Sequence, residues 1–216
     1  MECERFLMSV NATANEHALT TVVLYIDSDD PKLEEYKHIL ENEKYNGVSV
    51  VIGDRKPLGQ CWNQMARYTD ADILMMGNDD AIFQSIHWDD VLRIWDQKYP
   101  DGIYVLYPDD MSGNFRCTFP AVSRTWIDTL GYFVPEIFEF LANDTYIERV
   151  GNWIGRIHFL PQIQLEHLHF AFGKSQMDET YAEHRRSGAT KRDVNILGMN
   201  AERIYQDVNK LKAKMR

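Results

Sequence analysis

The stretch "ADILMMGNDDAIF", residues 71–83, indicates how the chain folds and where its chemistry lies. Four apolar residues are followed by a glycine and then by Asn78, Asp79 and Asp80. An apolar run without polar alternation is typical of a strand that is covered on both faces. Carboxylates that adjoin at the end of such a strand repel each other, and a hard divalent cation between them removes the repulsion. We therefore expect a buried strand that ends at a Mg²⁺ or Mn²⁺ site, although "NDD" is also a common turn sequence.

Strand and helix patterns alternate on both sides of this stretch. Helical spacing of apolar residues occurs at 3–14, 33–40, 60–69 and 88–95, and strand-like runs occur at 21–26, 48–54 and 102–110. Alternating elements of this kind predict a layered α/β fold. The region 117–160 mixes turns with short helices, and we expect it to form the walls of a site above the sheet.

Acidic residues follow three of the predicted strands. Asp27 closes the first, Asp54 closes the second, and Asp80 belongs to the cluster after the third. In an open α/β sheet the loops at the carboxyl ends of the strands converge on a crevice in which ligands bind. We therefore expect the three positions to contribute to one shared site.

The segment "LPQIQLEHLHF", residues 160–170, alternates as a strand does. Ile163, Leu165, His167 and His169 fall on one face, because successive side chains of a strand point to opposite sides. This face is apolar at one end and carries two imidazoles at the other. The histidine pair is therefore well placed to contact a metal ion or a phosphate.

The acidic strand end and the late histidines together resemble the GT-A glycosyltransferases, in particular small enzymes similar to the large inverting family-two group. In that family a D-x-D motif ends a hydrophobic strand and holds the metal that grips a nucleotide-sugar diphosphate. Asn78, Asp79 and Asp80 occupy the place of this motif, and the asparagine can still bond a ribose hydroxyl. The resemblance implies that Asp80, His167 and His169 hold Mn²⁺ or Mg²⁺.

The same resemblance covers most of residues 1–172 and implies further roles. The donor nucleotide sugar would be bound by Asp27, Asp54, Arg55, Gly59, Asn63, Asn78 and Asp79. The general base would be Asp144, with Glu136 and Glu139 as substitutes. Asp144 also precedes a helical stretch with a capping-box pattern, so a purely structural role stays open.

The implied architecture is a GT-A-like, Rossmann-like α/β domain, with a mixed, mostly parallel sheet flanked by helices and an irregular acceptor side. We expect this domain over residues 1–172 and a basic lid loop with a C-terminal helix over 173–216, packed on the same domain. The chain begins almost inside its first helix. We therefore expect the sheet to lack the first strand of the family and the nucleotide pocket to lack one wall.

Charge and composition narrow the partners. The net charge of −10 argues against nucleic-acid binding by the whole surface, whereas residues 174–216 carry 10 Lys and Arg against 6 Asp and Glu, a net charge of +4. Within them, residues 184–193 form either a solvated charge run or a mobile lid that offers Arg185, Arg186, Lys191 and Arg192 to phosphates. No apolar run is long enough to span a membrane, and the start does not resemble a signal peptide, so we expect a cytoplasmic protein with buried free thiols.

The leading functional hypothesis is a metal-dependent glycosyltransferase that uses a nucleotide sugar, a uridine diphosphate sugar above all, and inverts the anomeric centre. One variant transfers the sugar to a hydroxymethylated base in DNA, and a glycan is another acceptor. A metal-dependent phosphohydrolase or nuclease would use the same carboxylates and histidines. A non-catalytic nucleotide-sugar binder is the third alternative. The sequence leaves the sugar, the acceptor and the oligomeric state open.

Overall fold

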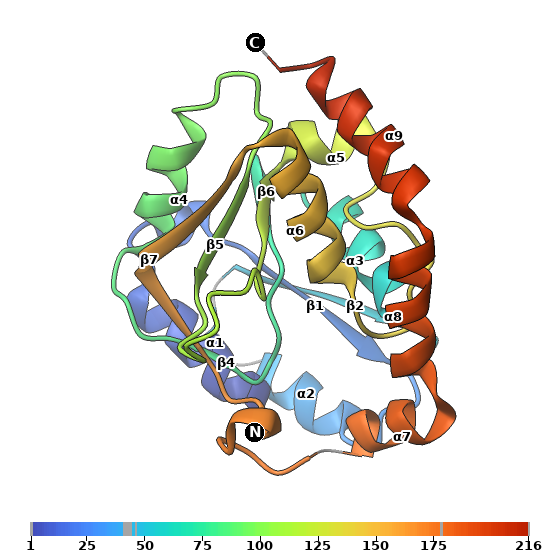
Figure 1. Ribbon diagram of the computed structural model, residues 1–216. Coiled ribbons are helices and arrows are strands. Elements are labelled where there is room, and N and C mark those ends of the chain that lie inside the picture. Colours follow the sequence, from blue (N-terminus) through green and yellow to red (C-terminus); the bar gives the residue numbers. More distant parts are fainter. Residues whose placement is uncertain (1, 41–44, 46, 178, 216) are drawn as a thin grey trace.

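Figure 1 shows the computed structural model, which describes residues 2–40, 45, 47–177 and 179–215. Its helices are α1 (Glu2–Thr13), α2 (Leu33–Leu40), α3 (Leu58–Arg67), α4 (Trp88–Asp96), α5 (Arg124–Leu130), α6 (Asn143–Ile154), α7 (Glu179–Ser187), α8 (Ala189–Met199) and α9 (Ala201–Lys212). Its strands are β1 (Val22–Asp27), β2 (Val48–Gly53), β3 (Ile73–Met75), β4 (Ala81–Phe83), β5 (Val105–Asp109), β6 (Ala121–Ser123) and β7 (Ile157–His167). Short 3-10 turns occur at His17–Leu19 and Phe170–Phe172.

The helix and strand patterns of the first half of the sequence are confirmed. α1 buries Cys3, Phe6, Leu7 and Val10, whose three- and four-residue spacing predicted the helix. β3 forms at the expected apolar run and stops before the glycine and the acidic cluster. The prediction that all three cysteines are buried thiols is also confirmed.

The described strands form two sheets. β1 and β2 pair in parallel, from Val22 opposite Val48 to Asp27 opposite Gly53. The second sheet has the order β3-β6-β5-β7-β4, in which β5 and β7 are parallel and the other neighbours are antiparallel. The predicted α/β class is confirmed, and the strand directions are mixed.

β7 changes its partner along its length. Its first residues pair with β5, where Ile157 lies opposite Val105. Its last residues pair with β4, where His167 lies opposite Ala81. One strand thus connects the centre of the five-stranded sheet with the chain that follows the acidic cluster.

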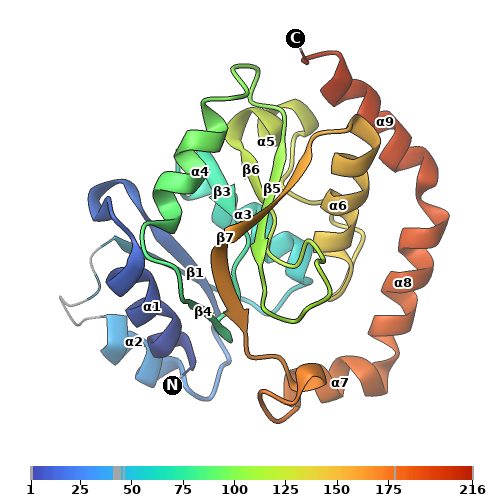
Figure 2. The same cartoon turned by 60° about the vertical axis from the view of Figure 1, so that its left-hand side comes forward.

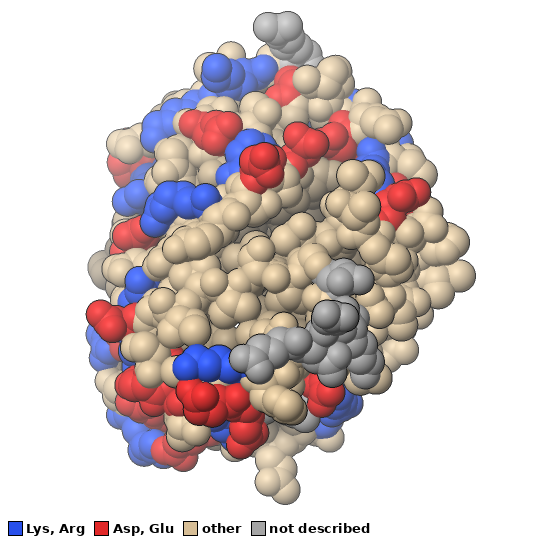
Figure 3. Space-filling view, turned by 180° about the vertical axis from the view of Figure 1, so that it is seen from behind, with Lys and Arg blue, Asp and Glu red and all other residues tan. Residues whose placement is uncertain are grey.

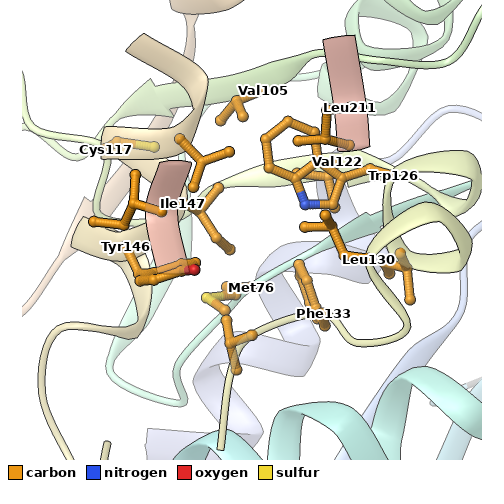
Figure 4. Packing of buried hydrophobic residues seen from close by; sticks show 14 of the residues in the cluster. Met76, Val105, Cys117, Val122, Trp126, Leu130, Phe133, Tyr146, Ile147 and Leu211 are labelled. Atoms are coloured by element: carbon orange, nitrogen blue, oxygen red, sulfur yellow. The ribbon is translucent and has the colours of Figure 1, made fainter. Parts of the chain in front are cut away.

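The hydrophobic core has two parts because neighbouring residues of a strand point to opposite faces of the sheet. Val105 belongs to the cluster with α5, α6, α8 and α9, whereas Leu106 belongs to the cluster with α1 and α4. Figure 4 shows the first cluster around Trp126, which is fully buried beside Val122 and Leu211. The five-stranded sheet is therefore covered on both faces, as its apolar strands predicted.

The C-terminal residues belong to the core. Figure 2 shows α7, α8 and α9 following one another along one side of the molecule. Leu197, Ile204 and Leu211 on α8 and α9 are buried in the cluster that contains Trp126. Where we expected a basic loop, residues 179–199 are helical on both sides of Gly188, whose φ of 77° lets the chain turn between α7 and α8.

The surface carries both signs of charge. In the view from behind in Figure 3, Lys and Arg lie among Asp and Glu above and below a central hollow. The hollow is lined mainly by side chains of other types. The described residues of this face form no broad basic area, which agrees with a chain of net charge −10.

We expect alanine at Gly151 to destabilise the fold. A Cβ there would lie 2.9 Å from Val105 Cγ2 and 3.2 Å from Ile157 Cβ, where α6 packs on the sheet. Overpacking of this kind costs about 1–3 kcal/mol. Gly198 on α8 is the matched control, since its Cβ would meet nothing within 4 Å and alanine should stabilise the helix by about 0.5–1 kcal/mol. Urea unfolding followed by circular dichroism measures both, and equal effects would contradict the packing argument.

Candidate metal and donor site

The pairing of β4 with β7 brings Asp80 to His167. The backbone N–H of Leu168 donates to the carbonyl of Asp80 over 2.8 Å, and the N–H of His167 donates to the carbonyl of Asp110 over 3.2 Å. As a result, Asp80 Oδ2 lies 3.2 Å from His167 Nε2. The structure therefore unites two side chains that are 87 positions apart in the sequence.

Polar atoms of this pair are buried without a hydrogen-bond partner among the described residues. They are Asp80 Oδ1 and both ring nitrogens of His167, of which Nε2 has only the close approach of Asp80 Oδ2. A buried polar group without a partner is unfavourable, and a metal ion that takes a carboxylate oxygen and an imidazole nitrogen would remove that penalty. The residues present therefore fit a divalent cation.

His169 completes the predicted set in part. It lies beyond the end of β7, so it does not share a strand face with His167 as expected. Its ring is nevertheless near, with 4.9 Å between the two ring centroids, and its Nδ1 accepts the N–H of Ala171. Among the described residues, no three His, Cys, Asp or Glu side chains converge closely enough to hold a metal by themselves.

Asn78 and Asp79 lie in the loop before Asp80. Both are exposed, and the Asn78 carbonyl accepts the N–H of Ala81, which makes this segment a turn as well as a candidate ligand site. Burial raises the pKa of the Cys3 thiol to about 11, and the charge of Asp79 adds to that increase. The N-terminus of α1 therefore lies next to the acidic loop.

A second acidic edge lies at the ends of β1 and β2. Arg55 Nε is 3.6 Å from Asp27 Oδ2, and Arg55 Nη2 is 3.4 Å from Asp29 Oδ1. The Asp54 carbonyl accepts the hydroxyl of Tyr25 over 2.7 Å. The structure thus brings Asp27, Asp54 and Arg55 together, as the resemblance implied.

The titration of Asp27 at this edge is shifted. Partial burial raises the pKa of its carboxyl, and Arg55 opposes the increase without cancelling it. The pKa of Arg55 is raised by its hydrogen bond to Asp29 and, more weakly, by Glu183 on α7. α7 therefore lies near the acidic edge formed by β1 and β2.

Asn63 and Gly59 on α3 pack against the segment that leads into α6. The buried Asn63 amide donates to the Val134 carbonyl over 2.9 Å, and its oxygen accepts the N–H groups of Phe133 and Val134. A Cβ at Gly59 would lie 3.1 Å from Asn143 Oδ1. Both residues position the loop before α6.

Asp144, the predicted base, is the second residue of α6. Its Oδ1 accepts the N–H of Thr145 over 2.6 Å. Burial raises the pKa of its carboxyl, and the bonds from Thr145 oppose that increase. The substitutes differ: Glu136 accepts from the Asn63 amide, and Glu139 pairs with Arg192.

The four basic residues of the predicted lid are exposed on α7 and α8. Arg186 pairs with Glu179, and Arg192 Nη2 lies 2.6 Å from Glu139 Oε2. Arg185 and Lys191 flank the turn at Gly188. Phosphate contact by these residues and their lid function stay predictions.

Tyr181 on α7 is a site neighbour that the sequence did not reveal. Its ring contacts His169, with centroids 5.0 Å apart, and Phe140, with centroids 5.1 Å apart. A single tyrosine in a strongly polar helix gives no pattern from which its position beside His169 could be predicted. It connects the histidine pair with the segment that precedes α6.

The fold is similar to that of glycosyltransferases whose structures are known. Among solved structures, the chain is similar to the mannosyltransferase PcManGT from Pyrobaculum calidifontis in complex with GDP-Man and Mn²⁺, with a TM-score of 0.62 and 12% identity, over 99% of this chain and 70% of that one. It is also similar to S. aureus TarS 1–349, with a TM-score of 0.59 and 12% identity, over 76% of this chain and 55% of that one. TarS 1–349 in complex with UDP-GlcNAc gives a TM-score of 0.58 at 12% identity, over 84% of this chain and 61% of that one.

These similarities confirm the predicted fold. The chain spans little more than half the length of the TarS chain that it matches. The sequence matches no protein-family model and no curated protein. At this level of identity the structural similarity shows the fold alone, and activity has to be argued from the site.

We expect Asp27→Asn to raise the melting temperature at pH 7. The folded pKa is above the unfolded value of 3.8, so ionising this carboxyl favours the unfolded chain. This destabilisation is absent well below pH 3.8 and develops as the pH rises through the folded pKa. Asparagine removes it, which should add about 2 °C at pH 7 and nothing at pH 3. Asp29→Asn, at the exposed partner of Arg55, is the control in the same thermal scans, and an equal gain there would contradict the burial argument.

Proposed function

We propose that the protein is a metal-dependent glycosyltransferase. It takes a sugar from a nucleoside diphosphate sugar, with a uridine diphosphate sugar as the preferred donor, and transfers it to a hydroxyl group of an acceptor with inversion. The observation that supports this most is the Asp80–His167 pair, whose buried polar atoms have no described hydrogen-bond partner. A fold neighbour complexed with GDP-Man and Mn²⁺ supports the same interpretation.

Asp80 and His167 would hold Mn²⁺ or Mg²⁺, with His169 beside them. Such ions usually complete their coordination with the phosphates of a substrate and with water, so two or three protein ligands are enough. When bound, the metal would supply Lewis acidity to the leaving diphosphate. Phe119 packs its ring against His167, with centroids 5.0 Å apart, and so fixes the imidazole.

The nucleotide would lie along the acidic edge formed by β1 and β2. Asp27 and Asp54 offer acceptors for the N–H groups of the base and the hydroxyls of the ribose. Asn78 and Asp79 approach the same ligand from the loop after β3. Arg55 would donate to the ligand, while Gly59 and Asn63 support the surrounding loop.

Asp144 would take the proton from the acceptor hydroxyl. A general base works best when its pKa lies near the working pH. Burial raises the pKa of the Asp144 carboxyl toward that range. A single displacement with one base and one leaving-group stabiliser inverts the anomeric centre. The bond from the anomeric carbon to the diphosphate breaks while the bond to the acceptor oxygen forms.

The acceptor in this proposal is a compound with a free hydroxyl group. A sugar chain and a hydroxymethylated DNA base are both compatible with the exposed basic residues of α7 and α8. No helix among the described residues is long and apolar enough to cross a membrane. Binding of the donor can be tested before the acceptor is known.

We expect one nucleoside diphosphate sugar to raise the melting temperature in the presence of Mn²⁺. A ligand at 100 times its Kd adds about 2.7 kcal/mol to the stability, or roughly 5–10 °C for a chain of this size. Asp80→Ala should abolish the shift, and Asp70→Ala, at an exposed residue after α3, should keep it. A shift that persists in chelator, or release of phosphate without any sugar donor, would contradict the proposal.

A further inference from the structure

The short segment Glu139–Leu141 is held by a carboxylate from the C-terminal helices. Asp193 on α8 is fully buried. Its Oδ1 accepts the N–H of Glu139 over 2.9 Å, and its Oδ2 accepts the N–H groups of Phe140 and Leu141 over 2.8 and 2.7 Å. Three successive amides thus converge on one side chain, which offsets the penalty of burying an ionised group.

The same segment joins the two sides of the proposed site. The Glu139 carbonyl accepts the N–H of Leu58, the first residue of α3, over 2.9 Å. The Phe140 carbonyl accepts from the side chain of Asn143, the first residue of α6, over 3.2 Å. α3 directly follows the loop that carries Arg55. A shift of this segment would therefore move the nucleotide edge and the start of α6 relative to each other.

The residue that follows the segment has an unfavourable backbone conformation. Ala142 has a φ of 70° and lies immediately before α6. Residues with a Cβ adopt this left-handed region rarely, and they persist there only when their surroundings fix both sides. Asp193 fixes the residues before Ala142, and the first turn of α6 fixes those after it, where the Tyr146 N–H bonds the Ala142 carbonyl.

We propose that Asp193 is a positioning residue for glycosyl transfer, an inference that rests on the proposed function. By binding the three amides of Glu139–Leu141, it keeps Ala142 in the left-handed conformation. The direction of the first turn of α6, and with it the place of Asp144 opposite the donor, depends on that conformation. Asp193 itself touches neither donor nor acceptor.

Asp193→Asn tests the proposal because it keeps the volume and removes the charge. The side-chain amide then offers one acceptor where three N–H groups need partners. The assay is hydrolysis of the preferred nucleotide sugar with Mn²⁺, in which water replaces the acceptor and the products are the free sugar and the nucleoside diphosphate. We expect kcat to fall by about 10- to 100-fold, since small misplacements of a reacting group have effects of that size. The KM for the donor should change less than about twofold, a split that a general loss of folded protein would not produce.

Asp207→Asn is the matched control. Asp207 on α9 is also a buried carboxylate, but it accepts from the hydroxyls of Tyr132 and Tyr146 and makes no described contact with Glu139–Leu141. Both variants should have a lower melting temperature than the original chain. The rate of each protein is therefore measured at the same number of degrees below its own melting temperature. We expect Asp207→Asn to keep kcat within about threefold of the original chain.

Two further variants keep the test decisive if Asp193→Asn folds poorly. Asp193→Glu retains the carboxylate and should recover most of kcat. Ala142→Gly in the Asp193→Asn background should recover part of it, because glycine adopts the left-handed conformation without strain. The proposal is overturned if Asp193→Asn keeps kcat, if Asp207→Asn loses as much, or if neither rescue raises the rate. If the original chain hydrolyses no donor, and no donor shifts its melting temperature, the proposed function is overturned as well.

Discussion

The pairing of β4 with β7 is the constraint on which the candidate site depends. It places Ala81 opposite His167 and therefore brings Asp80, the residue before Ala81, next to that histidine. Because side chains alternate along a strand, a change of register by one residue would turn the imidazole to the other face. The buried run of Ile163 and Leu165 on the same face as His167 makes such a slip unfavourable. The apolar core thus determines the geometry of a polar pair.

Much of this arrangement could be predicted from local sequence. The apolar run before Asn78 indicated a short buried strand, and the alternation after Leu160 indicated a strand with His167 on its buried side. The first signal is an uninterrupted apolar run and the second is an alternation, and both elements pack as these patterns predict. Asp27 and Asp54 were expected to lie together because each ends a strand, and the structure places these ends side by side, whereas Arg55 was implied only by the family resemblance.

Other features depended on partners that are far away in the chain. Asn63 was expected to meet the nucleotide, but its amide is used by Val134 and its neighbours, about 70 positions later. The basic segment around Gly188 reads as a loop from its charge, yet the apolar residues that pack α8 and α9 make it helical. In the sequence, Asp193 is only one of several charged residues in that segment. Only the fold shows that it is fully buried against backbone amides.

The division of the strands into two sheets has a mechanical consequence. Among the described residues, no backbone ladder joins β1 and β2 to the five-stranded sheet, and a two-stranded ribbon gains little stability by itself. The acidic edge with Asp27 lies on the ribbon, and the aspartate–histidine pair lies on the larger sheet. A ligand long enough to contact both would connect two separately hydrogen-bonded sheets. Amide protons of β1 and β2 should then exchange with solvent more slowly when the ligand is bound.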